Sequence, residues 1–279
     1  MRKSIQQGFT LIEMIVVIVI TGIIAGIVAI FIQAPVQGYV DSARRADLTD
    51  IADTAVRRVA RDVRMAVPNS VRLSGACPAC AIEYIPTKDG GRYRAVLDNL
   101  GAGDVLVFGA ADSSFDIVGG GIDFAAGDFI VVGSRESTAT WPYDQTATGV
   151  LRAYNGGAGV QTNVAITNAV GLRVEAELDS QRFDVVNGAE QAVTYACEGV
   201  GTDAAGNGTG RLVRYWGYGF DHAYTVADPN ADLADRVSAC TMTYDIANQR
   251  FGLVTISLTL TRENESVSLY NEIHVNNAP

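Results

Sequence analysis

The chain has 279 residues and a formal charge of −10, from 21 Lys and Arg against 31 Asp and Glu. This length is enough for one large domain or two small ones. The acidic balance argues against nucleic acid as a bulk partner, because phosphate contacts need a basic face, although a small local basic patch stays open. The 48% hydrophobic share leaves ample material for a folded core.

The first element is a long apolar run, GFTLIEMIVVIVITGIIAGIVAIFIQ, which contains one acidic residue, Glu13. Segment 9–32 has about 24 residues, roughly 36 Å of helix, which is enough to cross a bilayer. Arg2 and Lys3 precede it, so we expect a cytoplasmic N-terminus and an exported remainder. A cleaved secretory signal would have a shorter apolar core followed by a small-residue cleavage site.

Export places the four cysteines in an oxidising compartment, where pairing is expected. Four cysteines allow three connectivities. We predict the nearest-neighbour scheme, with disulfides Cys77–Cys80 and Cys197–Cys240.

Pro35 lies just past the apolar run and predicts a kink or loosening of the helix over 31–38, since proline removes a backbone bond and clashes with the preceding turn. We expect the helix to resume after Gly38 and to end before Pro68, which defines an amphipathic stem over 33–67. Apolar residues recur along it at helical spacing. They are Leu48, Ala52, Ala55, Val59, Val63 and Ala66.

The charged residues of the stem also follow a helical pattern. Asp41/Arg45 and Asp53/Arg57 are four apart in the favourable order. Arginines crowd the C-terminal half, where the helix dipole favours cations. They are Arg57, Arg58, Arg61 and Arg64. We interpret them as a solvated face rather than a ligand patch.

From position 71 onward short β-rich runs alternate with Gly, Asn and Asp clusters. The runs read as strands are AIEYI, DVLVF, DFIVV, RFDVV, AVTYAC, RLVRYW and CTMTYD. Segments 254–261 and 267–275 flank a turn at 262–265 and predict a long antiparallel hairpin with one buried face. A helix followed by an antiparallel sheet is an α+β fold, so 68–279 is expected to form a β-rich head.

The stretch from Gly8 through Phe9 to Glu13, GFTLIE, resembles the class III signal of type IV pilins and type II secretion pseudopilins. In that family a prepilin peptidase cuts after the Gly and methylates the new amino terminus. The resemblance therefore implies a leader at 1–8, cleavage between Gly8 and Phe9, and methylation of Phe9. It also implies that 9–32 is retained as the core helix of a filament.

The same resemblance implies a role for Glu13, because an acid inside a membrane span is by default functional with a named partner. The implied partner is the Phe9 amine of a neighbouring subunit. The alternative is a carboxylate near a helix start, stabilised by the macrodipole and snorkelling to the interface. One departure is that many pilins carry a proline inside the membrane helix, whereas here Pro35 follows the span.

Cys77-Pro-Ala-Cys80 is a CxxC motif and admits a redox reading. A thioredoxin-like site needs a thiolate at a helix N-terminus within a βαβ pattern. Here a proline-ended helix precedes the motif and a β-rich run follows it, so a structural disulfide is the favoured reading. A zinc site is weaker, because only one CxxC is present.

Asp228, Asn230 and Asp232 resemble the start of a calcium loop. The expected Gly is Leu233 and the twelfth position is Ala239 rather than Glu. Some pseudopilins bind calcium in C-terminal loops, so the three residues are kept as a candidate calcium site. The default reading is a solvated acidic turn, with no metal bound.

Aromatic residues crowd one strand-like segment; they are Tyr215, Trp216, Tyr218 and Phe220. Core packing is their ordinary explanation. An exposed patch for adhesion or subunit contact is the alternative.

Catalysis has little support. His222 and His274 have no metal-ligating partner at useful spacing, and the sequence lacks G-x-S-x-G, phosphate-loop and H-E-x-x-H motifs. We expect a structural protein that is not an enzyme and has no cofactor.

Taken together, the chain resembles a minor pilin, because a large head is hard to repeat at high density along a fibre. The chain resembles the MshO-type minor pilin of the mannose-sensitive haemagglutinin (MSHA) pilus. The similarity rests on the stem, APVQGYVDSARRADLTDIADTAVRRVARDVRMAVPNSVR, and the tail, LYNEIHVNNAP. It implies four partners: the prepilin peptidase, other pilins, an inner-membrane assembly platform, and the membrane before passage to the cell surface.

Three alternatives stay open. The first is a J-like minor pseudopilin of type II secretion. The second is a competence-type minor pilin that touches DNA, against which the acidic balance speaks. The third, from another class, is a membrane-anchored periplasmic thiol oxidoreductase that uses Cys77 and Cys80.

Overall fold

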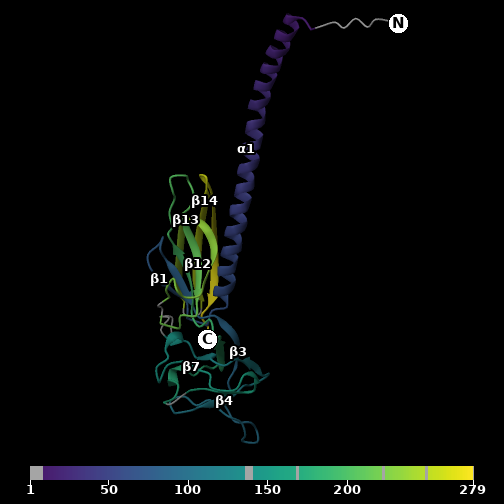
Figure 1. Ribbon diagram of the computed structural model, residues 1–279. Helices are drawn as coiled ribbons and strands as arrows, with labels where there is room; N and C mark the ends of the chain where they lie inside the picture. The colour runs from purple at the N-terminus through teal and green to yellow at the C-terminus, as the bar shows by residue number, and fades with distance from the viewer. Residues whose placement is uncertain (1–8, 136–140, 168–169, 222–223, 249–250, 279) are drawn as a thin grey trace, which may run out of the picture. The chain divides into compact units, whose positions relative to one another are not determined.

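The computed structural model describes residues 9–135, 141–167, 170–221, 224–248 and 251–278. The chain divides into two compact units, Met1–Asp47 and Leu48–Pro279. One helix, α1 (Leu11–Arg64), belongs to both units, and all described strands belong to the second (Figure 1). The expected α+β class is therefore confirmed: a long N-terminal helix and an antiparallel, sheet-rich head.

Helix α1 runs without interruption through Pro35, so the helix does not stop and resume at Gly38 as expected. Proline removes one backbone bond, but opening the helix would release a full turn of polar groups. In an apolar stretch those groups have no other partners, so continuing the helix costs less. The helix ends at Arg64, three residues earlier than the expected stem end at 67. There the chain turns to pair with another segment, and Val67 N–H donates to the Ile85 carbonyl at 2.8 Å.

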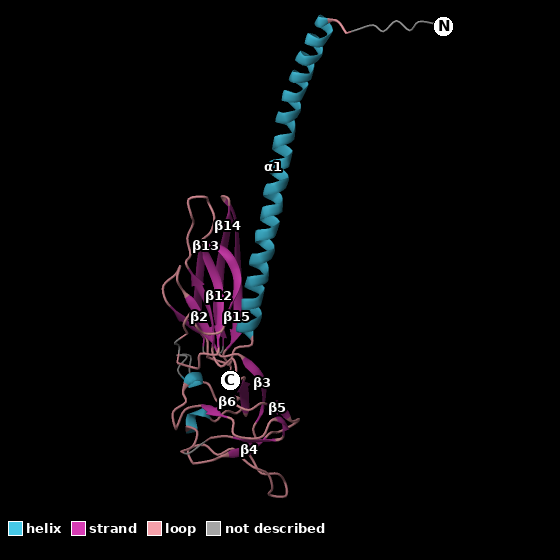
Figure 2. Ribbon diagram, in the orientation of Figure 1, coloured by secondary structure: helices cyan, strands magenta, loops and turns pink. Residues whose placement is uncertain are grey.

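A seven-stranded antiparallel sheet forms the half of the head that contacts α1 (Figure 2). Its order is β1-β2-β11-β12-β13-β14-β15. The strands are β1 (Arg72–Ser74), β2 (Ala81–Tyr84), β11 (Val193–Glu198), β12 (Gly210–Trp216), β13 (Asn230–Asn248), β14 (Phe251–Arg262) and β15 (Glu265–Asn276). All except the short β1 overlap a run predicted as a strand.

The predicted hairpin is β14 and β15, which pair over their whole length from Phe251↔Asn276 to Arg262↔Glu265. Glu263 and Asn264 form the turn, both with positive φ, at 49° and 68°. Two central residues with positive φ define the type I′ turn, whose twist matches that of paired strands.

The predicted apolar stripe of the stem is confirmed as the helix side of the main core. Five of its residues lie on α1 and the sixth, Ala66, follows its end; all six are buried, with Leu48, Ala52 and Val63 fully inaccessible. They pack with sheet residues such as Ile82, Tyr195 and Leu258. Small Ala side chains on the helix let it approach the sheet closely, and the period-2 pattern of β14 supplies the opposing face.

A second lobe is inserted between β2 and β11, and only two of its strands were predicted from sequence. It contains a four-stranded sheet, β3-β10-β6-β7, and two strand pairs, β4–β9 and β5–β8. Its strands are β3 (Thr87–Arg92), β4 (Ser114–Asp116), β5 (Ile122–Phe124), β6 (Phe129–Val132), β7 (Leu151–Ala153), β8 (Gly159–Gln161), β9 (Asn163–Ala165) and β10 (Arg182–Val186). Two short 3₁₀ turns, η1 (Trp141–Tyr143) and η2 (Val174–Ala176), complete it.

The run DVLVF, residues 104–108, was expected to be a strand and is not one. Only Phe108 makes a bridge, to Leu172. Val107 N–H donates to the Asp112 carboxylate at 2.7 Å, so a side chain takes the place of a partner strand. Asp and Asn side chains compete in this way with sheet ladders, which the apolar pattern alone does not reveal.

Candidate assembly site

The start of α1 is closed by a reciprocal pair of contacts between Thr10 and Glu13. The Thr10 hydroxyl accepts from Glu13 N–H, and the Glu13 carboxylate accepts from Thr10 N–H, each at 3.4 Å. The Thr10 carbonyl accepts the first helical bond, from Met14 N–H at 3.2 Å, which makes Thr10 the N-cap. This arrangement is a capping box, T-x-x-E, which satisfies helix donors that otherwise have no partner.

Glu13 therefore has a partner within its own chain, Thr10, which was not predicted from sequence. The signal was present as Thr10 followed three residues later by a glutamate, just before an apolar run. The contacts are long and the carboxylate is exposed, so both groups can exchange partners. Phe9 is 80% exposed next to this box. Gly8 and the expected leader 1–8 lie outside the described residues.

The apolar part of α1 is exposed along its entire described length, from Leu11 to Ile32. Within the described part of the chain, one helix, α1, is long and apolar enough to span a membrane. Exposed apolar surface on this scale marks a membrane or protein contact in a natural protein.

The stem arginines lie on the exposed face of α1, as the solvated-face interpretation expects. Arg57 pairs with Asp53 at 2.6 Å, as predicted, and Arg58 approaches Asp62 at 4.0 Å. Asp41 pairs with Arg44 at 3.2 Å.

The four cysteines form two disulfides, Cys77–Cys80 and Cys197–Cys240, in the nearest-neighbour scheme. Cys77-Pro-Ala-Cys80 lies in a loop between β1 and β2, and the Cys77 sulfur accepts from Met242 N–H at 3.3 Å. No helix begins at this motif, so the helix N-terminus that lowers the thiol pKa in thioredoxin-like sites is missing here. The geometry favours a structural bridge that fixes the β1–β2 loop against β13.

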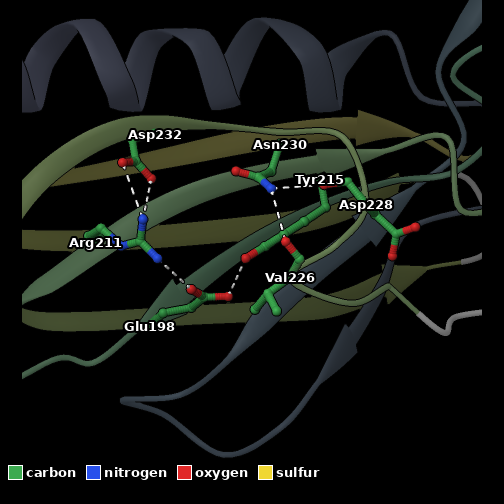
Figure 3. Close-up of polar contacts among 7 residues, drawn as sticks. All are labelled: Glu198, Arg211, Tyr215, Val226, Asp228, Asn230 and Asp232. Carbon is green, nitrogen blue, oxygen red and sulfur yellow. Dashed lines mark hydrogen bonds and ion pairs between the residues drawn. The ribbon is translucent and has the colours of Figure 1, made fainter.

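The three candidate calcium ligands do not converge (Figure 3). Asp232 pairs with Arg211 at 3.1 Å, and Asn230 donates through its amide nitrogen to the Asp228 carbonyl at 2.8 Å. The Asp228 carboxylate accepts from the Thr225 hydroxyl at 3.0 Å, which closes a local turn. Among the described residues, no group of three His, Cys, Asp or Glu side chains is arranged to hold a metal.

The aromatic cluster packs inside the head. Tyr215 and Phe220 are 2% and 4% exposed, while Trp216 and Tyr218 are partly buried against core residues. The Tyr215 hydroxyl donates to the Glu198 carboxylate at 2.7 Å on the face of the sheet away from α1 (Figure 3). Burial is the larger cause, and this hydrogen bond the second cause, that raise the pKa of Tyr215 to about 12. Core packing therefore accounts for these residues.

His274 is exposed on β15. His222 lies outside the described residues.

Comparison with known proteins finds a match at the N-terminus of the chain. Residues 3–29 match the family model described as the prokaryotic N-terminal methylation motif, about a tenth of the chain. No curated protein and no solved structure matches the chain significantly. The motif and the apolar part of α1 support a membrane-anchored, type IV pilin-like or pseudopilin subunit, a class that is generally structural and is processed by prepilin peptidase.

Proposed function

We propose that this chain is a minor pilin, processed at Gly8–Phe9 and assembled into a type IV pilus through α1. The observation that carries the proposal is the capping box of Thr10 and Glu13, placed at the start of an exposed apolar helix inside the methylation motif. Cleavage after Gly8 creates a positive amine on Phe9, which the peptidase methylates. The helix then remains in the inner membrane, with the N-terminus cytoplasmic and the head periplasmic, until the subunit passes into the filament.

The Glu13 carboxylate connects cleavage with assembly, because cleavage creates the amine with which it can pair. A carboxylate in an apolar environment is costly unless it is paired, and the Phe9 amine of a neighbouring subunit is a suitable cation. Before assembly, Thr10 supplies the carboxylate with hydrogen-bond donors. On assembly the neighbouring amine replaces these long contacts. An ion pair of this kind sets the register between helices more than it adds stability.

The MSHA-type pilus is the system that we propose. The head comprises two lobes, and such a bulky head suits a minor position at a tip or in an initiating complex better than a repeated one. A J-like minor pseudopilin of type II secretion would use the same N-terminal chemistry, so it is the second candidate. Assembly partners are the prepilin peptidase, the inner-membrane platform and other pilins.

Two variants separate pairing from capping. Glu13→Ala removes the carboxylate, while Thr10→Ala removes the side-chain cap but keeps the carboxylate. We expect Glu13→Ala to be cleaved normally but to be lost from sheared filaments, and Thr10→Ala to be cleaved and incorporated. Normal incorporation of Glu13→Ala would contradict pairing with the Phe9 amine. Equal loss of both variants would show that the role of Glu13 is limited to capping.

A further inference from the structure

Strand β15 is a long, regular edge of the seven-stranded sheet. It pairs with β14 over 12 residues with no shift of register, and no described strand pairs with its other side. The strand contains no proline and no lysine. Natural sheets usually block such an edge with a bulge, a proline, a lysine or a covering element, because an open edge is a template for another strand.

A groove runs between this edge and the stem part of α1. A hollow of about 590 Å³ is lined by α1 residues, including Val56, Ala60 and Arg61, and by Leu269 and Tyr270 of β15. A second hollow of about 170 Å³ shares Arg64 and Met65 with the first and reaches Asn276, also on β15. From 269 to 276 the strand covers roughly 27 Å, which is room for an extended segment of several residues.

The groove is basic although the chain as a whole is acidic. Arg57 is neutralised by Asp53. Arg61 and Arg64 are exposed, and within the described part of the chain neither has a carboxylate partner. Arg182 lines the second hollow together with Asp184. Tyr270, 63% exposed, lies on the opposite wall, where its hydroxyl donates to Glu272 at 2.8 Å.

We infer that the edge of β15 and this groove receive an extended acidic segment of another protein chain. The segment adds to the sheet through backbone hydrogen bonds, and its carboxylates face Arg61 and Arg64. A second copy of β15 is a poorer occupant, because it would bring two sets of these arginines together. Only the identity of the partner, a neighbouring subunit of the same filament, rests on the proposed function; the binding of an acidic strand does not.

The test uses the full chain in detergent micelles and a capped synthetic peptide of alternating valine and glutamate. A peptide of alternating valine and lysine is the control ligand, and Arg58→Gln is the control variant, since Arg58 is on the same helix but outside the groove. Binding is measured by fluorescence anisotropy. Amide hydrogen exchange then locates the peptide, and circular dichroism checks the fold of each variant.

We expect the acidic peptide to bind and to slow exchange of the β15 amides. The double variant Arg61→Gln/Arg64→Gln should bind at least about tenfold more weakly, and Arg58→Gln should bind like the wild type. The inference would be overturned if the acidic and the basic peptide bound equally well, if the double variant bound the acidic peptide as tightly as the wild type, or if the peptide left exchange of the β15 amides unchanged. Displacement of the peptide by a short DNA duplex at equal concentration, or protection of β15 by dimerisation alone, would also overturn it. None of these outcomes depends on cleavage at Gly8, which tests the proposed function separately.

Discussion

The hydroxyl of Tyr195 on β11 donates a hydrogen bond to the carboxylate of Asp62 on α1. Arg214 Nε lies 3.8 Å from the same carboxylate, and another guanidinium nitrogen of Arg214 donates to Glu190 at 3.2 Å. Burial, and then the contact with Asp62, raise the pKa of Tyr195 well above its ordinary value, so the phenol stays a donor. The stem is thus held on the sheet by a specific polar contact as well as by apolar packing.

Tyr195→Phe should lower the free energy of unfolding by about 1–2 kcal/mol, because a carboxylate loses a donor while the ring is retained. Tyr270→Phe is the matched control, since Tyr270 also donates to a carboxylate, Glu272, but is exposed. It should change stability by less than about 0.5 kcal/mol. Guanidinium denaturation of the full chain in detergent measures both. Equal effects of the two variants would mean that the contact with Asp62 does not stabilise the helix–sheet interface.

The two disulfides should differ in their contribution to stability. The Cys197–Cys240 bridge closes a loop with a sequence separation of 43, and Cys77–Cys80 one with a separation of 3. A chain-entropy model predicts a loss of about 4 kcal/mol for the first and about 1.6 kcal/mol for the second when each pair is changed to alanine. Thermal unfolding of the two double variants tests the order. A larger loss for Cys77 and Cys80 would contradict it.

Asp184 should make stability fall as the pH rises. Burial, only partly offset by Arg182, raises the pKa of Asp184 to about 6. The folded state then holds this proton more tightly than the unfolded state, so the stability it contributes is present below the unfolded pKa and is lost as the pH rises through about 6. Asp184→Asn should therefore be more stable than the wild type at pH 7, by about 1–2 kcal/mol after allowance for partial exposure.

Denaturation curves between pH 4 and pH 8 measure this difference. It should shrink as the pH falls toward the ordinary pKa of an aspartate, about 3.9, because Asp184 is then increasingly protonated in the unfolded state as well as in the folded state. Asp123→Asn, at an exposed position on β5, controls for the loss of a surface charge. A difference that stays constant with pH would show that Asp184 is not the titrating group.

The helix and the main sheet were predictable from sequence because each carries a strict local period. The stripe from Leu48 to Ala66 repeats with the helical period, and Val254 to Leu260 alternate with hydroxyl residues. Both patterns report which face is buried. The turn at Glu263 and Asn264 was also visible as a polar break between two alternating runs.

The second lobe was largely missed because its strands are short and lie far apart in sequence. Strands such as β4 and β9 have three residues each, too few to show a period. Long-range pairs, such as Asp62 with Tyr195, leave no local signal at all. The continuous helix at Pro35 was missed for a different reason. Proline disfavours the helix locally, but opening the helix in an apolar stretch would leave more backbone groups without partners, and that cost is larger.

We propose that cleavage after Gly8 allows α1 to enter a filament. The measurement to make is mass spectrometry of the N-terminal peptide, from sheared surface filaments and from the membrane fraction. We expect a methylated peptide beginning at Phe9 in the filaments. The same peptide found only in membranes would favour a secretion pseudopilin, or an initiating complex that stays at the base. A peptide still beginning at Met1 in both fractions would show that the chain is not cleaved after Gly8 and would overturn the proposed function.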